Sequence, residues 1–172
     1  MSYWIQLTLR LIHIFAGIFW AGSLLFFARL LGPALRASGG AGDKVSQDLI
    51  LNRGIGKVIP ITAGLTVLSG ITMYIRFAMA SQGAWPQSRT GIVFGIGGVA
   101  GLLALMAGAT MIGPSLERVA RTQVAAEKAG RALTDAENQL IAASRARAAL
   151  GFKLGTPLLL VAIAAMAIGR YV

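Results

Sequence analysis

The chain has 172 residues, of which 56% are hydrophobic and only 13% are charged, and its formal net charge is +10. Soluble domains carry about 25% charged residues, so this deficit indicates a chain solvated mainly by lipid. Cysteine is absent, which excludes disulfides, thiolate metal sites and thiol nucleophiles. The basic residues lie in loops beside apolar runs, without interleaved aromatic residues. This pattern favours an anionic membrane surface, and not nucleic acid, as their partner.

Four apolar runs predict four transmembrane helices within a single membrane domain, residues 1-172. The predicted spans are about 7-31, 58-80, 91-112 and 154-169. The first run is too long to be the core of a secretory signal peptide. At the α-helical rise, a run of about 25 residues reaches roughly 37 Å, enough to cross a bilayer with some tilt. We therefore expect an all-α integral membrane protein, folded as a four-transmembrane-helix bundle.

The distribution of lysine and arginine predicts the orientation of the bundle. The first and third loops carry most of the basic residues and all six acidic residues. By the positive-inside rule, these two loops face the cytoplasm, and both termini lie on the outer, periplasmic side of the inner membrane. Aromatic residues that prefer the membrane–water interface then gather at the outer surface, namely Tyr3, Trp4, Trp85 and Tyr171. No carboxylate lies within a span, which argues against a carboxylate-based proton relay.

The third loop predicts a cytoplasmic helical hairpin at about 115-151. Strong helix formers run from Ser115 to Ala129, and Gly130 is a plausible C-terminal stop. Thr134 and Glu137 then have the spacing of a capping box that starts the second helix. Two roles stay open for this hairpin, which either connects two spans or forms a docking surface for a partner.

His13 is the only histidine, and it lies inside the first predicted span. An ionisable side chain at that depth is a functional candidate, because even neutral imidazole needs a polar partner there. Gly17 and Trp20 follow on the same helical face, and Gly17 would leave room for a flat or bulky group beside the imidazole. The alternative is a histidine that hydrogen-bonds to a hydroxyl of a neighbouring helix.

The second span carries a stripe of hydroxyl groups at helical spacing. Thr62, Thr66 and Ser69 share one face with Met73 and Arg76. Such hydroxyls bond back to their own helix or across to another helix. Alternatively, the stripe lines a polar pocket for a quinone or for haem propionates, with Arg76 at its mouth.

The third span contains small residues at four-residue spacing, Gly91 with Gly95 and Gly97 with Gly101. Such pairs let helices approach closely, either within the bundle or between subunits, and they are the predicted contacts for a homodimer or for another membrane subunit. A soluble catalytic site is excluded, because the histidine lies in a span whereas every carboxylate lies in a loop. We assign no catalytic residue.

The stretch from His13 to Gly22, with Trp20 seven residues after the histidine and Arg29 beyond it, resembles the first helix of a group of small bacterial membrane proteins. The group comprises the copper-resistance D family, the membrane domain of some urate oxidases and the HemJ-type protoporphyrinogen oxidases. The following span, with Pro60 early and Gly70 late, is similar to their second helix, so the resemblance covers about eighty residues. It implies a helical bundle in the inner membrane and, in the HemJ-type branch, a b-type haem held by His13.

Two functions therefore remain as hypotheses. In the first, the bundle is a redox or copper-handling module with His13 as metal ligand and with His13, Gly17, Trp20 and Arg76 around haem b or copper. Copper(I) would also use methionine thioethers, which are soft ligands. In the second, the chain is a non-catalytic accessory subunit of a larger membrane complex and binds no cofactor. The sequence leaves open whether the chain is an enzyme.

Overall fold

The computed structural model describes residues 3–172, and within that range the chain is helical apart from short turns, with no strand. In the described range, four helices are long and apolar enough to cross a membrane, and only a minority of each span is buried inside the bundle. Large apolar side chains such as Phe15 and Ile18 point away from the bundle, with 69% and 66% of their surface exposed. The predicted all-α membrane bundle is confirmed.

The helices follow one another with few interruptions, and short π-helical turns extend several of them. The elements are α1 (Tyr3–Phe26), η1 (Phe27–Leu31), α2 (Gly32–Ala37), α3 (Gly39–Gln47), η2 (Asp48–Asn52), α4 (Ile55–Ala80), α5 (Ala84–Gln87), α6 (Arg89–Ala107), η3 (Gly108–Ile112), α7 (Gly113–Lys128), α8 (Asp135–Ile168) and η4 (Gly169–Tyr171). Each predicted span lies within one continuous helical segment, and these segments extend beyond the apolar runs.

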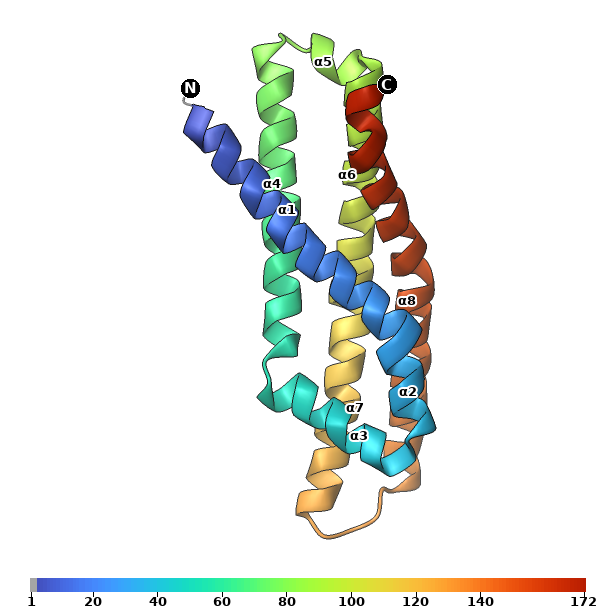
Figure 1. The fold of residues 1–172 in the computed structure, drawn as a ribbon. Helices are drawn as coiled ribbons and strands as arrows, with labels where there is room; N and C mark the ends of the chain where they lie inside the picture. The colour runs from blue at the N-terminus through green and yellow to red at the C-terminus, as the bar shows by residue number, and fades with distance from the viewer. Residues whose placement is uncertain (1–2) are drawn as a thin grey trace.

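The four long helices form two closely packed pairs, α1 with α4 and α6 with α8. Figure 1 shows α1 crossing the bundle diagonally, whereas α4, α6 and α8 run more nearly along its length. The buried core lies where the four helices meet and includes Trp20 at 4% exposure, Ala63 at 2% and Leu159 at 3%. Both termini and α5 lie at one end of the bundle, and α3 and the tip of the α7–α8 hairpin lie at the other (Figure 1). Which end faces the cytoplasm stays a prediction.

The glycines of α6 are used for packing within the chain. A Cβ on Gly97 would lie 2.9 Å from the Cβ of Ala165 on α8, and a Cβ on Gly101 would lie 3.9 Å from that of Ala162. Gly95 packs in the same way against the Tyr74 hydroxyl of α4. Of the two roles that the sequence left open for these glycines, close approach inside the bundle accounts for these contacts.

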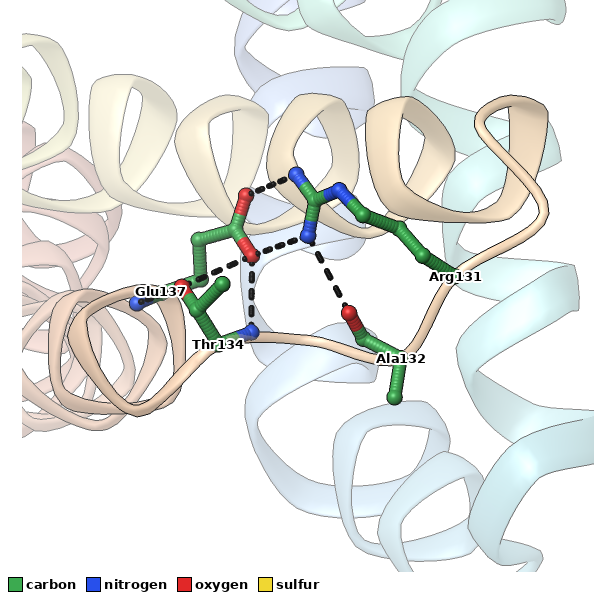
Figure 2. Close-up of polar contacts among 4 residues, drawn as sticks. All are labelled: Arg131, Ala132, Thr134 and Glu137. Carbon is green, nitrogen blue, oxygen red and sulfur yellow. Dashed lines mark hydrogen bonds and ion pairs between the residues drawn. The ribbon is translucent and has the colours of Figure 1, made fainter.

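The hairpin between the third and fourth spans has the predicted turn (Figure 2). The helix α7 ends at Lys128, and Gly130 adopts a left-handed conformation with φ of +61°. Thr134 and Glu137 form both hydrogen bonds of the capping box at the start of α8. The sequence did not reveal that Arg131 also binds both carboxylate oxygens of Glu137, at 2.7 and 2.8 Å.

The first loop folds into α2, α3 and η2, which the sequence did not predict. Figure 1 shows α3 running across the end of the bundle beside α7. Asp43 holds it there, because its carboxylate accepts hydrogen bonds from Arg145 of α8 at 2.8 Å and from Gln123 of α7 at 2.9 Å. Lys44 adds a longer ion pair to Glu127 at 3.6 Å. Three glycines lower the helix propensity of α3, so tertiary contacts stabilise it.

The second helix of the hairpin and the fourth span form one continuous helix. The helix α8 runs without interruption from Asp135 to Ile168, and Gly151 lies within it. The glycine serves for close approach, because a Cβ on Gly151 would lie 2.7 Å from Cγ1 of Ile112 and 3.0 Å from Cβ of Met111. Glycine lowers the stability of an isolated helix, but here the absence of a side chain at Gly151 allows two helices to pack closely.

Candidate functional site

The candidate site lies where α1 crosses α4, at two glycines that bring the helices together. A Cβ on Gly17 of α1 would lie 3.4 Å from the Thr66 methyl group, so the space beside this glycine is filled by α4. A Cβ on Gly70 of α4 would lie 2.8 Å from Cε1 of His13, so the imidazole ring lies directly on α4 at this glycine. The missing side chain at position 70 is therefore what admits His13 between the two helices.

The imidazole of His13 is held by the backbone of α4. Its Nδ1 lies 2.8 Å from the carbonyl oxygen of Thr66 and 3.4 Å from the hydroxyl of Ser69. A carbonyl oxygen only accepts hydrogen bonds, so Nδ1 carries the proton and donates it. In the neutral imidazole, Nε2 then keeps its lone pair and is the nitrogen that can bind a metal or accept a hydrogen bond.

The hydroxyl stripe of α4 bonds mainly to its own helix. Thr62 donates to Val58, Thr66 donates to Thr62, and Ser69 donates to the Leu65 and Thr66 carbonyls. The sequence suggested a hydroxyl as the partner of a structural His13, whereas the shortest contact is to a main-chain carbonyl. The stripe thus packs the α1–α4 interface, and Ser69, 5% exposed, is its most buried member.

Two further polar side chains continue the helical faces of His13 and Ser69 toward the terminal end of the bundle. Gln6 precedes His13 by seven residues, and Arg76 follows Ser69 by seven residues, so each shares a helical face with its neighbour. We call the set Gln6, His13, Thr66, Ser69 and Arg76 the polar seam. Within the described chain, Nε2 of Gln6 and Nη1 of Arg76 are buried and have no hydrogen-bond partner. The sequence singled out Arg76 but not Gln6, although the spacing from His13 was readable.

Trp20 and the methionines are further residues that the sequence proposed for the site. Trp20 belongs to the hydrophobic core with Leu24 and Ala63, so its contacts are those of a packing residue. Among the methionines, Met73 shares the helical face of Ser69 and Arg76. Met79, by contrast, is 75% exposed. Helical spacing thus places His13 and Arg76 on faces that lie toward the α1–α4 interface, whereas Trp20, on the same face of α1 as His13, lies in the hydrophobic core.

An apolar groove of about 490 Å³ is lined by α6 and by Leu158 of α8, at the depth of His13. Tyr74 of α4 lies beside Gly95 of α6, so these two residues are at the same depth. One turn deeper on each helix are Gly70, which contacts His13, and Val99, which lines the groove. His13 itself does not line the groove. The lining residues are Gly95, Ile96, Val99, Ala100, Leu103 and Leu158.

A second, polar cleft of about 590 Å³ lies between the first loop and α7, at the hairpin end of the bundle. Three of its charged lining residues, Lys44, Asp48 and Arg121, form ion pairs with residues outside the lining. Hydrogen bonds from Arg53, and from Asn52 of the cleft, lower the pKa of the Asp48 carboxyl. The side chains of these ion pairs are exposed, as on an ordinary solvated loop surface.

Within residues 3–172, no group of three or more His, Cys, Asp or Glu side chains is arranged to hold a metal ion. Comparison of the chain with protein-family models, with curated proteins and with solved structures finds no match. The interpretation of the site therefore depends on the geometry of the polar seam and on the chemistry of its side chains.

Proposed function

We propose that this chain is a redox module of the bacterial inner membrane that holds haem b through Nε2 of His13. The observation that carries the proposal is the hydrogen bond from Nδ1 of His13 to the Thr66 carbonyl, at 2.8 Å. Histidines that bind metals almost always donate their other ring N–H to a carbonyl or carboxylate, which fixes the tautomer and the orientation of the ring. The resemblance of the first eighty residues to haem- and copper-handling membrane proteins supports the same role.

Haem suits the seam better than copper because of the donors beside His13. Arg76 and Gln6 both present buried N–H groups without partners in the described chain, and haem propionates are carboxylates that accept such hydrogen bonds. Copper(I) would combine His13 with thioethers, for which Met73 is the methionine on the same face of α4. When bound, haem supplies one-electron redox chemistry, while the chain orients the imidazole and excludes water from the interface.

An absorption spectrum of the purified full-length chain tests the proposal. We expect a Soret band that shifts on reduction with dithionite and that is lost in His13→Ala. The loss of one interhelical hydrogen bond should lower stability by only about 0.6 kcal/mol, so the variant bundle should still fold. Metal analysis on the same preparation distinguishes haem iron from copper.

A second variant tests the position of the imidazole and not its presence. In Gly70→Ala, the new Cβ would lie 2.8 Å from the His13 ring, so the ring must move and haem retention should fall. Gly64→Ala is the matched control on the same helix, because a Cβ there meets nothing within 4 Å. Retention of haem in His13→Ala would refute the ligand assignment. A stable wild-type chain without haem or copper would favour the accessory-subunit hypothesis.

A further inference from the structure

We propose that Gln6 and Arg76 form a carboxylate-binding subsite at the outer end of the polar seam. This inference deepens the proposed function, because it states that the molecule bound at His13 carries a carboxylate group. The subsite is defined by two side chains on two different helices, α1 and α4, so it exists only where these helices pack together.

The first argument is that both side chains have unmet hydrogen-bonding capacity. Nε2 of Gln6 and Nη1 of Arg76 are buried, and neither has a hydrogen-bond partner within residues 3–172. A buried donor without a partner loses its hydration and gains nothing in return, so such groups are rare and call for an explanation. The two donors belong to α1 and α4, which pack against each other, and we attribute both to a bound molecule that supplies the acceptors.

The second argument concerns the chemistry of that molecule. Both orphaned atoms are donors, so the ligand must present acceptor oxygens. The guanidinium of Arg76 is positively charged, and the seam contains no acidic side chain to balance it, so the ligand must be anionic. A carboxylate offers one oxygen to each of the two donors, whereas a phosphate would leave further charged oxygens without donors.

The third argument is the position relative to His13. Gln6 lies seven residues before His13, and Arg76 lies seven after Ser69, which contacts His13 at 3.4 Å. Seven residues correspond to about 10 Å along a helix. The subsite is therefore two helical turns from the imidazole, on the side of the termini. A molecule that reaches both must be an elongated or flat amphiphile with its carboxylate near the membrane surface.

The same reasoning makes a prediction for the protein without ligand. Replacing an unpartnered buried donor by an apolar side chain of similar size removes a desolvation cost and no interaction. Arg76→Met and Gln6→Leu should therefore leave the thermal stability of the ligand-free chain unchanged or raise it. A structural role for either side chain would instead lower the stability.

Haem b and its dimethyl ester test the subsite on the full-length chain, because only the first has free carboxylates. We expect the wild-type chain to bind haem b at least about tenfold more tightly than the ester. In Arg76→Met this preference should disappear, while the Soret maximum that reports His13 ligation stays in place. Arg89→Gln is the matched control, since it removes one exposed positive charge from the start of α6, outside the seam. It should keep the preference.

A second ligand series separates failure of the subsite from failure of the haem proposal. Dodecanoate should raise the thermal midpoint of the wild-type chain, whereas methyl dodecanoate and dodecyl phosphate should not, and Arg76→Met should lose the effect. This result with no haem binding would support the subsite and refute the haem proposal. Equal binding of haem b and its ester, equal midpoints with dodecanoate and its methyl ester, or a strongly destabilised Arg76→Met would each overturn the subsite.

Discussion

The turn of the α7–α8 hairpin gives the sharpest prediction for stability (Figure 2). Thr134→Ala removes the hydroxyl that accepts from the Glu137 amide at 3.3 Å and that also donates to its carboxylate at 3.0 Å. Loss of such a threonine cap costs about 1 kcal/mol. If the turn opens locally, this corresponds to about fivefold faster amide exchange at 135-137. The spans should show unchanged exchange.

The pH dependence of the same turn follows from Glu137. Its hydrogen bonds with Arg131 and with the Thr134 amide lower the pKa of this carboxyl from 4.5 to about 2. A carboxyl whose folded pKa is depressed stabilises the fold above its unfolded pKa, and this contribution is lost as the pH falls through the folded value. Amide protection in the turn should therefore decrease between about pH 4.5 and pH 2.

Hydrogen exchange with mass spectrometry on the full-length chain in detergent measures both effects. Glu137→Gln is the control for the pH series, because it removes the titrating group and should flatten the profile in that range. Equal protection of 135-137 in wild type and Thr134→Ala would refute the role of the cap. A pH profile that survives in Glu137→Gln would show that another group causes it.

Three further predictions concern the rest of the bundle. Asp43→Asn should release α3 from the hairpin, because it weakens the contact with Arg145 at 2.8 Å; faster exchange in 39-52 but not in α8 would show this. Gly97→Val should lower the stability by about 1–3 kcal/mol through overpacking against α8, which thermal unfolding measures; an unchanged midpoint would contradict the close approach. If the termini lie outside, an impermeant maleimide on intact cells should label Gln87→Cys and not Gly40→Cys; the reverse pattern would invert the orientation.

The sequence alone was sufficient for the helical class and for the number of spans. Both depend on local quantities, namely the length of an apolar run against the thickness of a bilayer and the need to satisfy every backbone hydrogen bond in lipid. The capping box of Thr134 and the stop at Gly130 were also predictable, since their partners lie within a few residues. Orientation, inner-membrane location and cofactor stay predictions.

Features that join distant parts of the chain required the tertiary structure. The sequence showed that His13 needs a polar partner, but the crossing of α1 and α4 at Gly70 decides that the partner is the Thr66 carbonyl and that Nε2 keeps its lone pair. Likewise, no local pattern relates Asp43 to Arg145, which lies 102 residues away. The glycines of the spans are a further example. A glycine in a span predicts that another helix approaches closely, but it does not show which helix. The neighbouring helix depends on how the helices cross, and the packing of the whole bundle sets the crossing.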